Sequence, residues 1–243
     1  MVDLLTCCRS AHGDALFDMD GTLFDGDLGE TTFLLCLVGE LLERDPLLLD
    51  SAQIASASFD SAIPAYAQIQ SYQDALENGL FQQAYRMTAS YMARYSDEQI
   101  FQFCKHAFSH FQEPTPLPGF SLVLHTRSSV DLLLLLRACQ RNLVPVYLVS
   151  ASPLSVVRSF CRLFDLDQVI CLGADHDDPV LPYGEGKVQA LARMQVKKAC
   201  LGFGNSTSDA PMLGLCEHVF FRNPEEDGTL HDLCEKNGWT ELF

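Results

Sequence analysis

The second half of the chain alternates between short apolar runs and segments whose apolar residues recur at helical spacing. Residues 144–150 (VPVYLVS) have the composition of a buried strand, and residues 153–164 have the spacing of a helix. The alternation continues with a strand over 168–172, a helix over 187–194, and strands over 199–203 and 218–221. This pattern predicts a parallel sheet flanked by helices.

The first half of the chain has a different pattern. One apolar strand is expected at residues 15–19, and the pattern from residue 27 to residue 113 is helical, with candidate helices over 28–44, 64–77, 80–95 and 97–110. The proline-rich EPTPLPG at 113–119 is typical of a hinge that returns the chain to the core. We therefore predict an α/β fold with two domains. Residues 1–26 and 114–243 would form a Rossmann-like parallel sheet with helices on both faces, and residues 27–113 would form an α-helical cap domain inserted after the first strand.

Composition limits the classes of function. The formal net charge is −16 and no basic cluster exists beyond Lys197-Lys198, so a nucleic-acid-binding surface is not expected. The longest apolar run, at residues 132–136, is far shorter than the roughly 20 residues of a membrane-spanning helix. The N-terminal MVDLLTCCRSAHG lacks the basic start and long apolar core of a secretory signal, which favours a cytoplasmic location. The ten cysteines have no C-x-x-C spacing and are expected to be mostly reduced core residues.

Two carboxylates stand where the first predicted strand ends, in the stretch ALFDMDGTLF at residues 15–24. Asp18 and Asp20 are one residue apart, and side chains on an extended chain alternate between its two sides. Both can therefore face one site only if the chain turns directly after Asp18, and Gly21 permits such a turn. A polar turn at a strand end is the structural alternative.

Three further polar segments lie at comparable places in the pattern: Ser150-Ala-Ser152, the Gly186-Lys187 turn that opens a helix, and GNSTSD at 204–209. With D-x-D-G-T at residues 18–22, these segments occur in an order that resembles the haloacid dehalogenase (HAD) superfamily of phosphotransferases, over nearly the whole chain. The resemblance implies an HAD-like fold and the activity of a phosphoric monoester hydrolase, a phosphatase with a phosphoaspartate intermediate.

The resemblance also implies roles for the two aspartates of the first motif. Asp18 matches the nucleophile that would form the aspartyl-phosphate, and Asp20 matches the general acid that protonates the leaving oxygen and later acts on water. Two carboxylates repel a phosphate dianion, so Mg²⁺ is the implied cofactor, held by the Asp18 carboxylate and the Asp20 backbone carbonyl.

The later motifs supply the phosphate-binding groups. Ser150 matches the family's phosphate-binding hydroxyl, with the amide of Ala151 donating beside it, and Lys187 matches the lysine that holds the nucleophile and the phosphoryl charge together. Ser152 fits the N-cap of the helix that follows it, and we assign it that role. A lysine at a helix start opposes the helix dipole, which favours a functional role for Lys187.

The fourth motif departs from the family pattern, because Asn205 stands where the family usually has an aspartate. Its amide oxygen can still ligate Mg²⁺, but it brings no charge, so the affinity for the metal is expected to be lower. Asp209 would then orient metal-bound water or Lys187. We expect an active enzyme, with a weakened HAD-fold binding or regulatory protein as one alternative and a phosphotransferase to an alcohol acceptor as another. Dehalogenation is disfavoured because it has no use for Asp20 as a leaving-group acid.

The substrate is expected to be a small phosphorylated metabolite. The helical insertion after the first motif resembles the phosphoserine phosphatase-like branch, and GDLGETT (26–32) and YGEGKVQAL (183–191) resemble its phosphorylcholine phosphatase-like members. Residues 27–113 contain eight more acidic than basic residues and several aromatics, which suits an ammonium group such as that of phosphocholine or phosphoethanolamine. Aromatics at helical spacing are also typical of a core. The aromatics in question are Phe59, Tyr66, Tyr72, Phe81, Tyr85, Tyr91 and Phe101.

Individual residues of this insertion leave the choice of substrate open. Asp27 and Glu30 follow the first motif closely enough to line the cleft, although either can instead serve as N-terminal charge for the next helix. Phosphoserine, which bears a carboxylate, would need an arginine facing the site, and Arg86 and Arg94 are the candidates. The sequence is compatible with a monomer or a homodimer, without nucleic-acid or membrane partners.

Overall fold

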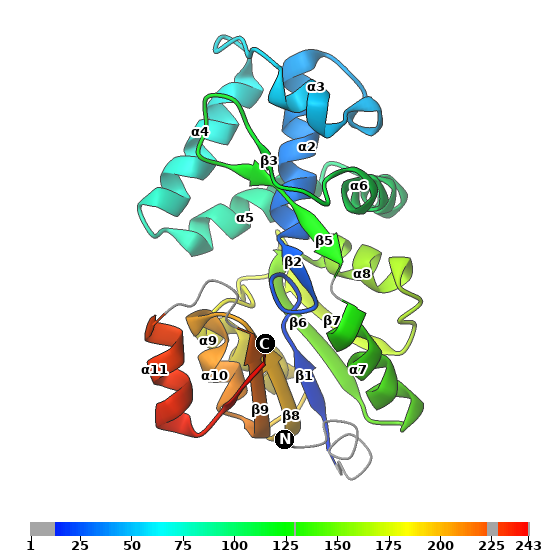
Figure 1. The fold of residues 1–243 in the computed structure, drawn as a ribbon, viewed down its shortest axis with the longest axis vertical. Coiled ribbons are helices and arrows are strands. Elements are labelled where there is room, and N and C mark those ends of the chain that lie inside the picture. The colour runs from blue at the N-terminus through cyan, green and yellow to red at the C-terminus, as the bar shows by residue number, and fades with distance from the viewer. Residues whose placement is uncertain (1–12, 129, 223–227, 243) are drawn as a thin grey trace.

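A computed structural model describes residues 13–128, 130–222 and 228–242 of the chain (Figure 1). The expectation of no secretory signal was based on residues 1–13, and most of these lie outside the described residues. In the part that is described, no helix has both the length and the apolar character needed to cross a membrane.

Six parallel strands form the central sheet (Figure 1). The strand that carries the first motif lies in its interior, because residues 15–17 pair with residues 146–148 on one side and with residues 201–203 on the other. The predicted parallel α/β sheet is thus confirmed. In their order across the sheet the strands are β10 (Thr240–Leu242), β9 (Cys216–Arg222), β8 (Ala199–Gly204), β1 (Ala15–Phe17), β6 (Val146–Pro153) and β7 (Val169–Ala174).

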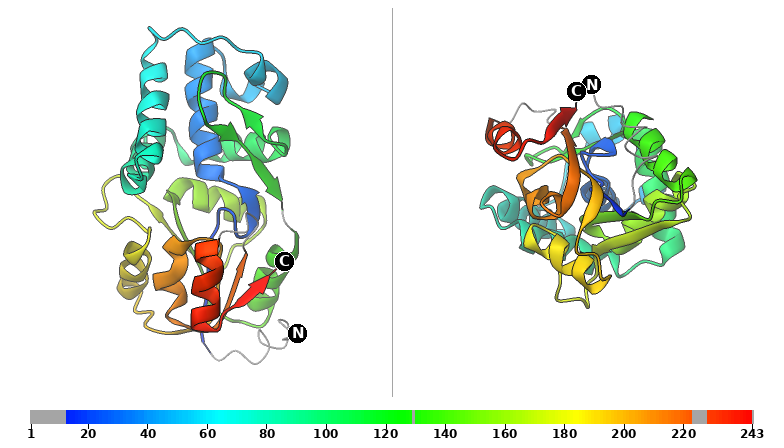
Figure 2. Two further views of the ribbon diagram at one scale, coloured as in Figure 1. Left: turned by 60° about the vertical axis from the view of Figure 1, so that its left-hand side comes forward. Right: turned by 90° about the horizontal axis from the view of Figure 1, so that it is seen from below.

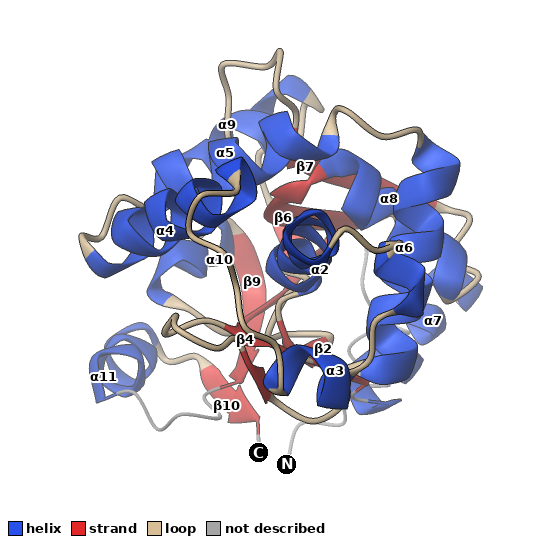
Figure 3. Cartoon of the chain, turned by 90° about the horizontal axis from the view of Figure 1, so that it is seen from above, coloured by secondary structure: helices blue, strands red, loops and turns tan. Residues whose placement is uncertain are grey.

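Helices cover both faces of the sheet (Figures 2 and 3). Phe17 of β1 points to the face covered by α7 (Val130–Arg141) and α8 (Leu154–Leu163). Leu16, the preceding residue, points to the opposite face and packs in the cluster that includes side chains of α9 (Glu185–Arg193) and α10 (Ala210–Leu213). This alternation follows from the two-residue period of a strand, and it leaves β1 buried on both sides. The outer helix α11 (Gly228–Asn237) packs against Phe221 of β9.

A helical insertion, residues 28–110, lies above the carboxyl ends of the strands (Figure 1). Its longest helix begins directly after the first motif and is buried along nearly its whole length, as expected for a helix surrounded by the others. The elements of the insertion are α2 (Leu28–Leu42), the 3₁₀ helix η1 (Pro46–Leu48), α3 (Ser51–Ala55), α4 (Pro64–Glu77), α5 (Phe81–Met92) and α6 (Asp97–His110).

The chain leaves the core and returns to it side by side. The short strand β2 (Phe24–Gly26) precedes the insertion and pairs antiparallel with β5 (Thr126–Ser128), which follows it. The expected hinge at 113–119 contains β3 (Thr115–Pro116), which pairs with β4 (Val123–Leu124). Backbone hydrogen bonds therefore fasten both ends of the insertion at one place beside the first motif.

Apolar side chains of the insertion and of the sheet form one continuous cluster. The ring of Phe24 lies 5.1 Å from that of Phe108 on α6 and 5.4 Å from that of Phe160 on α8. Such aromatic contacts stabilise beyond their buried area, and they hold the insertion against one face of the sheet. The division into two domains at residues 26/27 and 113/114 stays a prediction.

Several predicted element boundaries were wrong by a few residues, and some elements were missed. The helix expected over 28–44 ends at Leu42 because Glu43 adopts the left-handed conformation, with φ 51°. Helix α7 was not predicted, because its run of leucines obscures the helical period; Leu134 is 56% exposed whereas Leu133 and Leu135 are buried. The polar α11 and the short edge strand β10 gave no clear pattern either.

The cysteines of the described residues are buried or half-buried, as expected of core residues. Cys36 and Cys104, for example, carry free thiols inside the helical insertion.

Replacing Phe24 by alanine is expected to destabilise the whole chain by about 3–5 kcal/mol, because it empties the contact between β2, α6 and α8. Chemical denaturation followed by circular dichroism measures the loss. Leu48→Ala is the control, since that side chain is 71% exposed and should change stability by less than about 0.5 kcal/mol. Equal stability of the two variants would show that the aromatic contact does not join the insertion to the core.

Candidate active site

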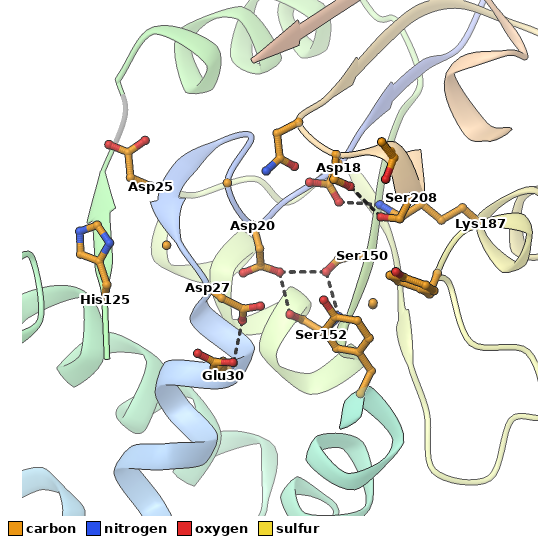
Figure 4. A pocket seen from close by; sticks show the side chains of 18 of the residues that line it. Asp18, Asp20, Asp25, Asp27, Glu30, His125, Ser150, Ser152, Lys187 and Ser208 are labelled. Atoms are coloured by element: carbon orange, nitrogen blue, oxygen red, sulfur yellow. Dashed lines mark hydrogen bonds and ion pairs between the residues drawn. The ribbon is translucent and has the colours of Figure 1, made fainter. Parts of the chain in front are cut away.

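A cavity of about 660 Å³ opens at the carboxyl ends of β1, β6 and β8, facing the helical insertion (Figure 4). Such a position is where open parallel sheets bind their ligands. Five carboxylates line the cavity, whereas Lys187 is the only lysine or arginine among its described lining residues. The carboxylates are Asp18, Asp20, Asp25, Asp27 and Glu30.

Lys187 lies at the centre of the buried polar groups. Its Nζ donates to Asp18 Oδ1 at 2.5 Å, to Asp209 Oδ1 at 2.6 Å and to the carbonyl oxygen of Val149 at 2.9 Å. The side chain is only 2% exposed. Burial alone would lower the pKa of Lys187, but the two carboxylates raise it well above its ordinary value, so the ammonium stays charged. The predicted lysine is therefore in direct contact with the predicted nucleophile.

Asp18 is placed by the end of β1, and its backbone N–H donates to the carbonyl oxygen of Phe203. Thr22 Oγ1 donates to its Oδ2 at 2.8 Å, across the turn that Gly21 makes with φ +72°. Burial raises the pKa of Asp18 to about 7, and the charge of Asp209 adds to this rise while Lys187 opposes it. The nucleophile predicted from the sequence is thus a buried carboxyl that shares a single ammonium with a second one.

Asp20 lies in a different environment. Its Oδ2 accepts from Ser150 Oγ at 3.0 Å and from Ser152 Oγ at 2.7 Å, and its Oδ1 accepts from the backbone N–H of Leu28 at 2.8 Å. Burial raises the pKa of Asp20 to about 7, and the charge of Asp27 adds to the rise. A carboxyl with such a pKa can carry a proton near neutrality, as a general acid must.

The prediction that Ser152 caps the following helix was wrong. Strand β6 continues to Pro153, which is the N-cap residue of α8, and no side chain caps that helix. Ser152 therefore lies at the end of a strand with its hydroxyl on Asp20. Gly29 of α2 makes room for it, since a Cβ there would lie 2.4 Å from Ser152 Oγ.

Ser150 and Ala151 line the cavity, as the phosphate-binding role requires. In this structure Ser150 Oγ donates to Asp20 and accepts from the backbone N–H of Ser152 at 2.9 Å. Its hydroxyl thus lies beside the Asp20 carboxyl, and its contact with phosphate stays a prediction.

Asp209 organises the loop after β8. Its Oδ2 accepts from the backbone N–H groups of Asn205 and Ser206, both at 3.0 Å, while its Oδ1 accepts from Lys187. The sequence pattern had offered two roles for Asp209, and its direct contact is with Lys187 rather than with the cavity.

Asn205 lies where its side-chain amide meets oxygens of the first motif. In the orientation that satisfies its hydrogen bonds, its amide nitrogen lies 3.0 Å from Asp18 Oδ2 and 3.1 Å from the carbonyl oxygen of Asp20. Gly21 must lack a side chain for this approach, because a Cβ there would come into steric conflict with the amide. With the amide rotated by half a turn, its oxygen would join these two oxygens. Three oxygens converging in this way fit a magnesium ion, which binds oxygen ligands.

Asp27 and Glu30 combine the two roles that the sequence left open. Asp27 is the N-cap of α2, where its Oδ1 accepts from the backbone N–H of Glu30 at 2.7 Å, and it also lines the cavity. Glu30 accepts from the hydroxyl of Tyr72 at 2.8 Å and lines the cavity too. Burial raises the pKa of Asp27 to about 7, with the charge of Glu30 adding to the rise. These two carboxyls have no cationic partner among the described residues.

The arginines proposed to face the site do not do so. Arg86 donates to the carbonyl oxygens of Asp178 and Pro179, and Arg94 forms an ion pair with Glu40. Both lie on exposed parts of the insertion, so neither lines the cavity.

Other lining residues were missed by the sequence analysis. Tyr183 lines the cavity together with Tyr85, and their ring centroids are 5.5 Å apart. His125 lines it from the segment between β4 and β5, where Thr31 Oγ1 contacts both its backbone N–H and its carbonyl oxygen. Asp25 also lines it and pairs with Arg222 at 2.8 Å. No local pattern marks these residues; Tyr183 begins a stretch that had been singled out only for its resemblance.

Solved structures with low sequence identity share this fold. A protein of unknown function from Bordetella pertussis Tohama I has a TM-score of 0.65 at 17% identity, with 95% of this chain and 97% of that chain covered. A functionally unknown protein from Anaerococcus prevotii has a TM-score of 0.59 at 16% identity, with 96% and 87% covered. The HAD family hydrolase t0658 from Salmonella enterica serovar Typhi has a TM-score of 0.55 at 12% identity, with 95% and 68% covered.

A comparison with curated protein sequences gives no match. The model of the haloacid dehalogenase-like hydrolase family, in contrast, matches residues 15–214, which include the sheet strands β1, β6, β7 and β8, the insertion and all four motifs. The chain therefore belongs to the haloacid dehalogenase-like hydrolase family.

Proposed function

We propose that the protein is a Mg²⁺-dependent phosphomonoesterase that acts on a small metabolite through an aspartyl-phosphate on Asp18. The observation that carries this proposal is the pair Asp18 and Asp20, which line one cavity in different environments. Asp18 is held by an ammonium, whereas Asp20 is held by two hydroxyls and an amide. Two carboxyls in unequal surroundings can divide the roles of nucleophile and acid.

The proposed reaction has two steps. In the first, the Asp18 carboxylate attacks phosphorus, the ester P–O bond breaks, and the proton of Asp20 passes to the leaving alcohol oxygen. In the second, the Asp20 carboxylate takes a proton from water as that water attacks the phosphorus, which releases phosphate and restores Asp18. The donors on Asp20 would hold its carboxyl still through both transfers.

Lys187 would keep the nucleophile ionised and in place. Its ammonium pairs with Asp18 Oδ1, and Asp209 holds it from the other side. An ionised Asp18 keeps a nucleophilic oxygen, and a positive charge beside it offsets part of the charge that a phosphoryl group brings.

The Asp18 carboxylate, the Asp20 carbonyl oxygen and the Asn205 amide oxygen would hold the metal ion. When bound, Mg²⁺ supplies positive charge that stabilises the transferring phosphoryl group. Asn205 would have to turn its oxygen inward, since its nitrogen faces those oxygens in the orientation that satisfies its hydrogen bonds.

On the side of the leaving group, Asp27, Glu30 and the tyrosines favour a cationic substrate. The excess of carboxylates over Lys187 in the cavity leaves negative charge that an ammonium would offset. Tyr85 and Tyr183 add ring faces that attract a cation. We therefore propose an amino-alcohol phosphate, such as phosphoethanolamine or phosphocholine. Phosphoserine is less well matched, because Arg86 and Arg94 bind elsewhere.

A second candidate function is a binding or regulatory protein with weakened catalysis, favoured by the uncharged Asn205. Catalytic turnover of a phosphoester would support the phosphatase, and its absence would support the binding or regulatory protein. A phosphotransferase would show a phosphorylated alcohol among the products when an acceptor is added.

Asp18→Asn is expected to reduce release of phosphate from p-nitrophenyl phosphate with Mg²⁺ by roughly a thousandfold or more, because an amide is a poor nucleophile. A colorimetric phosphate assay measures this. The control is Asp232→Asn, which changes an exposed aspartate on α11 and should leave the rate unchanged. Activity that survives in Asp18→Asn would overturn the assigned nucleophile, and an inactive wild-type protein across a phosphoester panel would favour the second candidate function.

Asn205→Asp is expected to tighten Mg²⁺ binding by about tenfold, because a charged ligand replaces a neutral one. Calorimetric titration of protein stripped with a chelator measures the affinity without relying on activity. The control is Asn78→Asp, which adds the same charge at the exposed C-cap of α4, outside the cavity. It should leave the affinity for Mg²⁺ unchanged. Equal affinities in wild type and Asn205→Asp would remove Asn205 from the metal site.

Glu30→Gln is expected to raise the KM for phosphoethanolamine by about tenfold with little change in kcat, because it removes a charge that would meet the ammonium. The glutamine can still accept from Tyr72, and p-nitrophenyl phosphate, which has no ammonium, should keep its KM. Glu217→Gln, an exposed site on β9, is the matched control. A parallel loss with both substrates would indicate structural damage and contradict the cationic subsite.

A further inference from the structure

Two cysteines meet between α8 and the edge strand β7, away from the four motifs. The sulfur atoms of Cys161 and Cys171 lie 3.4 Å apart, and both residues carry free thiols. Cys161 lies near the end of α8, and Cys171 lies within β7, the outermost strand on its side of the sheet. The contact therefore joins two elements that already pack together.

The geometry requires little movement for these sulfurs to bond. A disulfide has an S–S distance of about 2.05 Å, so the sulfurs would approach by roughly 1.4 Å, which side-chain rotation can largely supply. The residues are separated by ten positions in the sequence, and the backbone between them makes one tight connection from helix to strand. Helix α8 would keep its packing on the sheet, and β7 would keep its pairing with β6.

The two thiols differ in exposure and acidity. Cys161 is 7% exposed, whereas Cys171 is half-buried on the edge strand. The hydrogen bond from Cys161 lowers the pKa of Cys171 against the effect of burial, and Arg158 contributes to the lowering. The same hydrogen bond, together with burial, raises the pKa of Cys161. Cys171 is thus the thiol that an oxidant reaches first, and Cys161 is its neighbour.

We propose that Cys161 and Cys171 form a reversible disulfide that fastens α8 to β7 and stabilises the fold. With a hydroperoxide as the oxidant, the Cys171 thiolate attacks the terminal peroxide oxygen, the O–O bond breaks, and a sulfenic acid forms on Cys171. The other peroxide oxygen leaves with the electron pair of that bond and takes up a proton, which gives an alcohol, or water when the oxidant is hydrogen peroxide. Cys161, on losing its proton, attacks this sulfur, the S–S bond forms, and the sulfenic oxygen leaves as water. A dithiol reductant reverses the reaction by thiol–disulfide exchange.

The bond would fix two segments that lead to the cavity. Helix α8 begins two residues after Ser152, which donates to Asp20, and β7 is followed by the segment that carries Tyr183 to the cavity. Because Cys161 lies at the opposite end of α8 from Ser152, the bond would form without entering the cavity. This inference does not depend on the proposed substrate or reaction.

Peptide mapping tests the proposal directly. The folded full-length protein is treated with hydrogen peroxide, remaining thiols are alkylated, and the chain is cut with trypsin. Cleavage after Arg158, Arg162 and Lys187 places Cys161 in peptide 159–162 and Cys171 in peptide 163–187. Only a disulfide between them keeps these two peptides joined, and the joined species should separate on reduction.

Thermal unfolding gives the second readout. The oxidised wild-type protein is expected to unfold about 2–5 °C higher than the reduced protein, because the bond restrains the unfolded chain. Cys161→Ser and Cys171→Ser should show neither the joined peptide nor the rise. Cys216→Ser, which removes another half-buried thiol, should behave as wild type. The proposal would be overturned if the joined peptide is absent or if either cysteine is bonded to a different one. It would also be overturned if the joined peptide forms but the Tm does not rise.

Discussion

The ion pairs of the buried Lys187 ammonium with Asp18 and Asp209 are the constraint on which the site depends. They join the end of β1, the loop after β8 and the first turn of α9, which are far apart in the sequence. A buried charge left without a partner is strongly destabilising, so the three segments must meet if Lys187 is to be buried at all. The same contacts that organise the core therefore also orient the carboxylate proposed as the nucleophile.

Around this centre the cavity holds more negative charge than its ammonium can offset. Burial raises the pKa values of Asp18, Asp20 and Asp27 to about 7, so negative charge on these carboxyls is costly, and Lys187 opposes the rise at Asp18. Such crowding is costly for the fold alone, and it is relieved by protons, a divalent cation or a cationic ligand. The metal ion and the cationic substrate proposed above would both reduce this cost.

The helical insertion does more than cover the cavity. The first turn of α2 supplies an amide to Asp20 from Leu28, and the bare backbone of Gly29 leaves space for Ser152. The insertion and the sheet share one apolar cluster, which includes Phe24. These contacts therefore depend on the packing between the insertion and the core. The site is therefore built jointly by the end of the sheet and the start of the insertion.

The sequence by itself determined the parallel sheet, the helical insertion and the motif residues, because periodicity and short-range spacing are local properties of the chain. Contacts between distant residues were decided only by the tertiary structure. The hydroxyl of Ser152 binds Asp20 instead of capping α8, because β6 continues to Pro153, three residues further than expected. Likewise, His125 and Tyr183 line the cavity although no local pattern marks either residue as a lining residue, because the pairing of β2 with β5 and the packing of α5 set their positions. Local pattern specifies which elements form, whereas burial and charge pairing across the sequence decide which side chains meet.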